Sequence, residues 1–253
     1  MGKFYREIAI MFHRQMLLLG QSPDALVTAI MIPMILMLVF VLIFGGAMNV
    51  GDYSYVNFVT FAVMIQATVQ ASGLSAVSAH QDMKQGMIER FRSMPVSRLA
   101  FLLSHVLAGV VRNAIAVLGM LLVALLLGFR SSAGVVQWLG IAGLMLLFMT
   151  ALSWVATFIS VATKSAESAA GVPALLALLT FVSSGFAPVE TLPGWLQGFA
   201  RRQPLTVIID TLRGLAFGAD IGLLWVGALA WCLGLIVAFQ MASLLLFYKK
   251  LAV

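Results

Sequence analysis

The sequence predicts an all-α membrane protein with six transmembrane helices, because it is apolar, poor in charge and built from long apolar runs. Hydrophobic residues make up 62% of the 253-residue chain, charged residues only 9%, and the mean hydropathy is +1.06. Soluble domains carry about 25% charged residues, so this chain has too few charges to cover a water-facing surface. The same composition excludes a disordered chain, a disulfide scaffold and a conventional nucleic-acid-binding protein.

The apolar runs are long enough to cross a membrane, which takes about 20 mainly apolar residues in helical form. Five runs contain no Asp, Glu, Lys or Arg, namely residues 25–51, 53–81, 131–163, 168–189 and 221–248. A sixth run, residues 99–129, is interrupted only by Arg112. Its two pieces are too short to cross separately, so we predict one long span. Six crossings place both termini on the same side.

The distribution of Lys and Arg predicts which side that is, since cytoplasmic loops are enriched in basic residues. With a cytoplasmic N-terminus, ten basic residues face inward: Lys3, Arg6, Arg14, Lys84, Arg90, Arg92, Arg98, Lys164, Lys249 and Lys250. Four face outward: Arg130, Arg201, Arg202 and Arg213. We therefore expect a protein of the bacterial or archaeal cytoplasmic membrane with both termini in the cytoplasm. Most of the net charge of +6 then reflects topology, and no nucleic-acid partner is expected.

Motifs for catalysis, metal binding and secretion are missing from the sequence. The three histidines are scattered, and the only Gly-Lys pair, Gly2-Lys3, is followed by Phe4, so no P-loop is present. Cys232 is the one cysteine, which excludes an intrachain disulfide. The first apolar run is too long for a signal-peptide core. We predict no catalytic residue, no metal site and no cofactor in this chain. If the process is driven by ATP, another polypeptide hydrolyses it.

Residues 1–22 are predicted to form an amphipathic helix, which the segment 21–24 then ends. Apolar residues gather on one side of this helix. The charged side carries Lys3, Arg6, Glu7 and Arg14. Such a helix lies in the inner headgroup layer. It is either a plain membrane anchor or an interface helix that also touches a cytoplasmic partner.

Residues 79–98 form the most charged loop, and apolar side chains at helical spacing accompany its charges. A solvated loop would explain the charges alone, whereas an apolar patch ringed by charge is typical of a docking surface. We favour docking. The candidate contact residues are His80, Lys84, Met87, Ile88, Glu89, Arg90, Phe91, Arg92 and Pro95.

Residues 183–220 are predicted to form two short amphipathic helices at the outer surface. Pro193 begins the first helix, and Gly218 ends the second. The alternative is an ordinary loop with aromatic anchors. The candidate outer-gate residues are Glu190, Trp195, Phe199, Arg201, Arg202, Asp210 and Arg213.

Polar residues inside the spans are candidates for a transport pathway, because polar groups are costly in lipid and usually face protein or water. They are Gln66, Gln70, Arg112, Asn113, Thr150, Ser153 and Thr157. The alternative is helix packing, in which small residues and hydroxyls let backbones approach. For Arg112 a further alternative is that the side chain extends toward the inner surface.

Two motifs at the expected topological positions resemble one family. Residues 86–98 (GMIERFRSMPVSR) resemble its segment with an acidic-Arg pair followed by Met-Pro. Residues 199–205 (FARRQPL), continued by 210–215 (DTLRGL), resemble its second hallmark. The chain is similar over essentially its whole length to the membrane subunits of ABC exporters of the type-2 permease family, of the daunorubicin-resistance type.

This resemblance implies a single permease domain, residues 1–253. It implies a coupling helix in the 79–98 loop that docks on a separate ATP-binding subunit, which binds ATP and Mg. Two permease chains and two ATP-binding chains would form the exporter, with the substrate between the permeases. The expected substrate is an amphipathic drug or lipid-like compound. Alternatives are export of a lipid-linked polymer, ion efflux, an intramembrane enzyme or an assembly protein.

Overall fold

The structure is a computed structural model that describes residues 2–21, 23–46, 54–84 and 97–252. Within these ranges the regular elements are all helical. They are α1 (Gly2–Gly20), α2 (Pro23–Val39), η1 (Phe40–Phe44), α3 (Tyr55–Asp82), α5 (Arg98–Leu126), α6 (Val135–Ala162), α7 (Ala166–Phe181), η3 (Val189–Thr191), α8 (Gly194–Arg202), α9 (Pro204–Phe217) and α10 (Leu224–Ala252).

Four of the described helices are long and apolar enough to cross a membrane, namely those at Tyr55–Asp82, Leu99–Leu126, Val135–Ala162 and Leu224–Lys249. They coincide with four of the six predicted spans. The other two predicted spans contain shorter apolar helices, at Ile30–Phe44 and Ala166–Phe181. The all-α architecture is therefore confirmed, while the count of six crossings stays a prediction.

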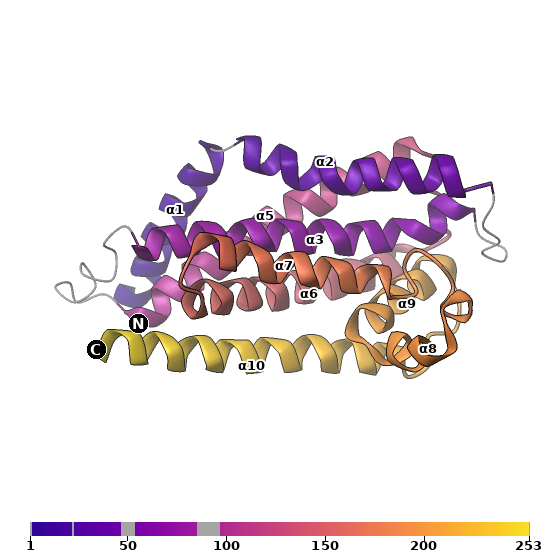
Figure 1. Ribbon diagram of the computed structural model, residues 1–253. Coiled ribbons are helices and arrows are strands. Elements are labelled where there is room, and N and C mark those ends of the chain that lie inside the picture. The colour runs from indigo at the N-terminus through magenta and orange to yellow at the C-terminus, as the bar shows by residue number, and fades with distance from the viewer. Residues whose placement is uncertain (1, 22, 47–53, 85–96, 253) are drawn as a thin grey trace.

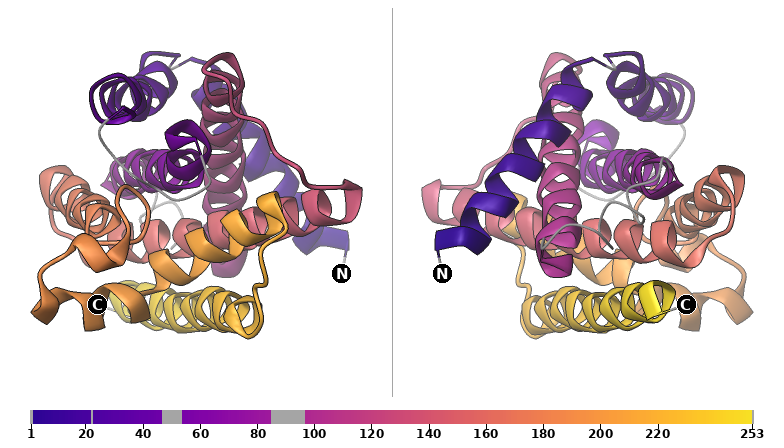
Figure 2. Two further views of the ribbon diagram at one scale, coloured as in Figure 1. Left: turned by 90° about the vertical axis from the view of Figure 1, so that its right-hand side faces the viewer. Right: turned by 90° about the vertical axis from the view of Figure 1, so that its left-hand side faces the viewer.

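The helices form one elongated bundle in which α2, α3, α5, α6, α7 and α10 alternate in direction (Figure 1). Both chain termini lie at one end of this bundle, which we call the terminal end. The short helices α8 and α9 lie at the opposite end, the α8–α9 end. Viewed along the bundle, α3 lies among α2, α5, α6 and α7, while α10 lies at the edge (Figure 2).

The central position of α3 follows from its many small residues, which let neighbouring backbones approach closely. A Cβ atom added at Gly73 would lie 2.9 Å from the Cβ of Pro173 on α7, so only glycine fits there without movement. Most of α3 is buried, whereas α10 is mainly exposed along the bundle. An exposed apolar face such as that of α10 is suited to contact with lipid.

The predicted breaks at the two ends of the bundle are confirmed. Helix α1 ends at Gly20 and α2 begins at Pro23. Helix α8 follows Pro193 directly, and α9 ends at Gly218, whose φ of 72° lies in the left-handed region that favours glycine. The predicted segment 183–220 therefore contains two short helices, and the alternative of an ordinary loop is wrong.

The fifth apolar run leaves the helix at its outer end, because α7 ends at Phe181, just before residue 183, where the outer segment was predicted to begin. The amides of Val182 and Ser183 bond to carbonyls only three residues back, which tightens the turn. The amide of Ser184 then donates to Thr206 Oγ1 of α9 at 3.3 Å. This contact across the fold takes the chain out of the helix, and 16 helical residues give a length of only about 24 Å.

Candidate functional site

At the terminal end, side chains of α1 form hydrogen bonds with Asp82, the last residue of α3. Arg14 donates from Nη1 and Nη2 to both carboxylate oxygens of Asp82, at 3.1 and 3.2 Å. Gln15 Nε2 donates to Asp82 Oδ2 at 2.7 Å, and His105 Nε2 of α5 lies 3.6 Å from the same oxygen. Asp82 is buried, so this carboxylate joins three helices at the point where α3 ends.

The same helix α1 also forms a hydrogen bond at the N-terminal end of α5. Glu7 Oε2 accepts a hydrogen bond from the backbone amide of Ser97 at 2.9 Å. Ser97 is the N-cap of α5, where a carboxylate both accepts from a free N–H and is favoured by the helix dipole. Helix α1 therefore holds both ends of the charged 79–98 loop, through Asp82 and Ser97. Among the predicted interface residues, Glu7 and Arg14 make these contacts.

The candidate docking residues of this loop fall into two groups. Met87, Ile88, Glu89, Arg90, Phe91, Arg92 and Pro95 lie outside the described residues. Lys84 is exposed, as a docking residue should be. His80 is buried, and its Nδ1 lies 3.1 Å from the carbonyl oxygen of Ser160 on α6. Its ring contacts this chain itself and holds α3 against α6.

In the middle of the bundle, Asn113 of α5 is the centre of a small polar cluster. Its amide nitrogen donates to Ser72 Oγ of α3 at 3.0 Å, and to the Met149 carbonyl and Ser153 Oγ of α6 at 3.3 Å each. Asn113 and Ser153 are fully buried. Three helices are thus joined by one amide whose hydrogen bonds are all made within the protein, which is a packing role.

The other pathway candidates do not join this cluster around a shared cavity. Thr150 and Thr157 donate to carbonyls of their own helix. Arg112 Nη1 donates to Ser75 Oγ of α3 at 2.8 Å. Gln66 is buried within α3, and Gln70 lines a groove of about 150 Å³ between α2, α3 and α7. For Asn113, Ser153, Thr150 and Thr157 the geometry favours the packing alternative.

Close packing at this cluster predicts a strong effect of enlarging Gly109. A Cβ atom there would lie 2.8 Å from Ser153 Oγ and 3.2 Å from Ser153 Cβ. We expect Gly109→Val to lower the free energy of unfolding by about 2 kcal/mol, because overpacking forces the helices apart. Gly143→Val is the matched control, since a Cβ atom at Gly143 meets nothing within 4 Å. Thermal unfolding in detergent measures both, and equal midpoints would contradict the expectation.

At the α8–α9 end, Arg213 of α9 connects three segments. Its Nη1 lies 3.0 Å from Asp210 Oδ1, an ion pair between i, i+3 neighbours on α9. Its Nη2 donates to the carbonyls of Phe58 and Ser184, at 3.1 and 3.0 Å, and its guanidinium lies 3.8 Å above the Phe58 ring. Ser184 Oγ also donates to Asp210 at 2.6 Å. Burial raises the pKa of the Asp210 carboxyl, an effect that the Ser184 hydrogen bond and the Arg213 charge oppose.

The remaining outer-gate candidates lie on the surface of the same end. Arg201 and Glu190 form an ion pair of 3.1 Å in which both side chains are exposed. Trp195 is 82% exposed, which suits an aromatic anchor at a membrane interface. The seven predicted residues therefore divide into an ion pair of buried Arg213 with half-buried Asp210, and an exposed group on and before α8.

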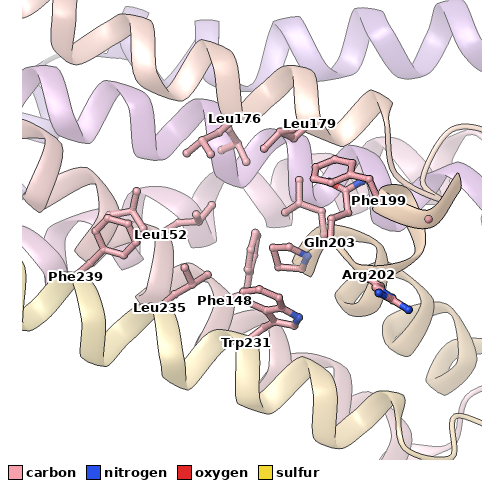
Figure 3. Close-up of a pocket in the computed structure, with 15 residues that line it drawn as sticks. Phe148, Leu152, Leu176, Leu179, Phe199, Arg202, Gln203, Trp231, Leu235 and Phe239 are labelled. Carbon is pink, nitrogen blue, oxygen red and sulfur yellow. The ribbon is translucent and has the colours of Figure 1, made fainter. Parts of the chain in front are cut away.

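An apolar cavity of about 640 Å³ lies beside α8 and α9, bounded also by α6, α7 and α10 (Figure 3). Phe148, Trp231 and Phe239 contribute aromatic rings to its wall. Phe199 and Arg202 were candidates from the sequence, whereas Gln203 and the residues of α6, α7 and α10 were not. No sequence motif links these distant segments, so only their assembly reveals the cavity. Among the described residues, no group of three His, Cys, Asp or Glu side chains is placed to hold a metal ion.

Comparisons with known proteins show the family of this chain. The model of the family described as ABC-2 type transporter matches residues 6–217. The chain is 29% identical over 245 residues to the daunorubicin resistance ABC transporter permease protein DrrB1 of Streptomyces coeruleorubidus, which covers 94% of this chain and 84% of that protein. It is 28% identical over 214 residues to the probable doxorubicin resistance ABC transporter permease protein DrrC of Mycobacterium tuberculosis, covering 83% and 76%.

A third relative, the doxorubicin resistance ABC transporter permease protein DrrB of Mycobacterium tuberculosis, is 27% identical over 179 residues, covering 68% of this chain and 58% of that protein. The family match spans both motifs on which the resemblance depends, residues 86–98 and 199–215. Together with the apolar helices, it identifies an integral membrane protein. This chain belongs to the ABC-2 type transporter family of membrane permeases.

Proposed function

We propose that this chain is the membrane subunit of an ATP-driven exporter that moves an amphipathic drug or lipid-like compound out of the cytoplasm. The family match over residues 6–217 is the observation that carries this proposal. All three of these relatives are named for resistance to daunorubicin or doxorubicin, and both drugs are amphipathic. The chain would act as a permease dimer powered by two copies of a separate ATP-binding subunit, which would bind the ATP and Mg.

The topology that this function requires is six crossings with both termini in the cytoplasm. The alternating direction of the six apolar helices supports it, as does the placement of both termini at one end (Figure 1). Within the 79–98 loop, the described residues stop at Lys84 and resume at Ser97. On each side, α1 makes a hydrogen bond at the neighbouring helix end, to Asp82 and to Ser97. The terminal end would then face the cytoplasm, and α8 and α9 would lie in the outer leaflet.

The loop of residues 79–98 is proposed as the contact with the ATP-binding subunit. Closure of that subunit on ATP would push the loop, and a push on a packed helix end moves the helix as a rigid body. Because α1 is bonded to both ends of the loop, it would transmit the push to α3 and α5 together. This mechanism gives α1 a part in coupling and favours the interface-helix interpretation over that of a plain anchor.

Co-purification tests the proposed assembly. We expect a tagged chain, extracted from its native membrane in mild detergent, to retain an ATP-binding subunit with a Walker A motif. Mass spectrometry of the purified complex identifies this subunit, and light scattering gives its stoichiometry. A complex that contains no ATP-binding subunit under several mild detergents would overturn the exporter proposal.

The double substitution Glu89→Ala with Arg90→Ala tests the docking surface. We expect transport-linked ATPase activity to fall about tenfold while the permease is still produced, because charge-assisted hydrogen bonds contribute roughly 1.5–3 kcal/mol. Lys164→Ala is the control, since Lys164 is an exposed basic residue in the next loop at the terminal end. Equal activity of the double variant and the unchanged protein would remove Glu89 and Arg90 from the docking surface.

A further inference from the structure

The cavity between α6, α7, α10 and the α8–α9 turn has the size and chemistry of a ligand site. Its volume of about 640 Å³ lies within the range of roughly 300–1,000 Å³ that is usual for small-molecule pockets. On α10 its wall extends from Trp231 to Phe239, a length of about 12 Å. Apart from Arg202 and Gln203, the lining residues are apolar or glycine.

Gln203 is the exception in this wall. It is only 4% exposed, and neither its Oε1 nor its Nε2 has a hydrogen-bond partner in the described part of the chain. A buried amide without partners is costly, by about 1–3 kcal/mol for each unsatisfied group. Gln197 on α8 provides the contrast, because its Nε2 donates to the carbonyls of Glu190 and Leu192. The Gln203 amide is therefore available to pair with a group that is not part of the fold.

Phe199 provides the access to this amide. Gln203 and Phe199 lie next to each other at the α8 side of the cavity (Figure 3), and the backbone amide of Gln203 donates to the Phe199 carbonyl at 3.0 Å. The Phe199 side chain is 51% exposed, so little packing holds it in place. Rotation of this ring would open the Gln203 amide to a ligand in the cavity. Arg202 is exposed at the edge of the same site.

The two unsatisfied atoms define the polar group of the ligand. Nε2 needs an acceptor and Oε1 needs a donor, so the partner must provide both side by side, as an amide does and as an ionised carboxylate, which only accepts, does not. The ester groups of phospholipids only accept hydrogen bonds. We infer that this cavity binds an amphipathic molecule with an apolar, ring-bearing body and an amide-like group that pairs with Gln203, with Phe199 as the side chain that moves aside.

If the chain is an exporter subunit, this cavity is a site for the exported compound. Only that identification rests on the proposed function. Binding itself requires no ATP, so the site is tested on the full-length permease in lipid nanodiscs. The probe is 4-benzoylbenzamide, a photoreactive two-ring compound with a primary amide. Its matched control is 4-methylbenzophenone, which replaces the amide by a methyl group.

After irradiation, peptide mass spectrometry locates the labelled residues. In the unchanged protein we expect the amide probe to label the stretch from Trp231 to Phe239 about five- to tenfold more than the methyl probe, because it gains two neutral hydrogen bonds. Gln203→Leu should abolish this preference. Gln137→Leu, an exposed glutamine on α6 outside the cavity, should retain it.

Equal labelling by the two probes in the unchanged protein would overturn the inference, because the site would then not recognise the amide. This comparison needs no variant, so it holds even if Gln203→Leu fails to fold. A preference that persists in a folded Gln203→Leu protein would overturn the role of Gln203. Failure of the exporter proposal would appear separately, as the absence of an ATP-binding subunit in co-purification.

Discussion

Replacing Arg213 with alanine is expected to lower the free energy of unfolding by about 3–5 kcal/mol, the largest effect on stability that we predict for a single side chain. Arg213 is buried at the α8–α9 end. Its guanidinium bonds to Asp210 and to the carbonyls of Phe58 and Ser184. The alanine variant would leave all three acceptors without this donor, and the Asp210 carboxyl would lose the positive charge that favours its ionised form.

The exposed ion pair on α8 is the control for this prediction. Arg201→Ala also removes an arginine that is bonded to a carboxylate, at 3.1 Å from Glu190, but both of these side chains face solvent. Exposed pairs of this kind contribute about 0–1 kcal/mol. Thermal unfolding in detergent should therefore separate the two variants clearly. Similar midpoints for Arg213→Ala and Arg201→Ala would contradict a structural role of the buried arginine.

Replacing Asp82 with alanine is expected to have the largest effect on transport. Asp82 accepts hydrogen bonds from Arg14 and Gln15 of α1 and lies beside His105 of α5. Without the carboxylate, α1 would keep its bond to Ser97 but lose its bond to α3. We expect efflux to fall at least about tenfold while the ATP-binding subunit still binds, because loss of charge-assisted hydrogen bonds weakens the link by roughly 1.5–3 kcal/mol.

Efflux and ATPase activity in the same proteoliposomes measure this uncoupling. Asp82→Asn should fall between the alanine variant and the unchanged protein, since the amide retains one acceptor oxygen and loses the charge. Glu167→Ala is the matched control, because Glu167 is an exposed carboxylate at the start of α7, at the same end of the bundle. Full efflux in a folded Asp82→Ala exporter would remove α1 from the coupling mechanism.

Much of the fold could be predicted because its signals are local. Four long apolar helices were predicted close to their observed bounds, and so were the ends of the short helices at Pro193 and Gly218. Each depends on a run of residues or on one residue with a fixed backbone preference. The fifth span ends close to residue 183, where the outer segment was predicted to begin, but the Ser184–Thr206 hydrogen bond at this end joins residues 22 positions apart and could not be predicted.

The candidate sites likewise divide into contacts between near neighbours in sequence and contacts between distant segments. Asp210 and Arg213 were both candidates from the sequence, and their pairing is local, because i, i+3 neighbours on a helix are close in space. Asp82, Gln15 and Gln203 were missed, since each depends on its partners or on its surroundings in other segments. His80 looked like a surface residue in a charged loop, but α3 continues through it and buries it against α6.

Composition, run length and local motifs are properties of the chain alone, and they were enough to predict an all-α membrane protein that resembles a permease family. Which polar residues act together became clear only from the packing of the helices. Helix packing brought Arg14 to Asp82, Ser72 to Asn113 and Gln203 to an apolar cavity. Hydrogen bonds and burial depend on the distances between helices. Those distances result from packing between distant segments, and no local sequence pattern gives them.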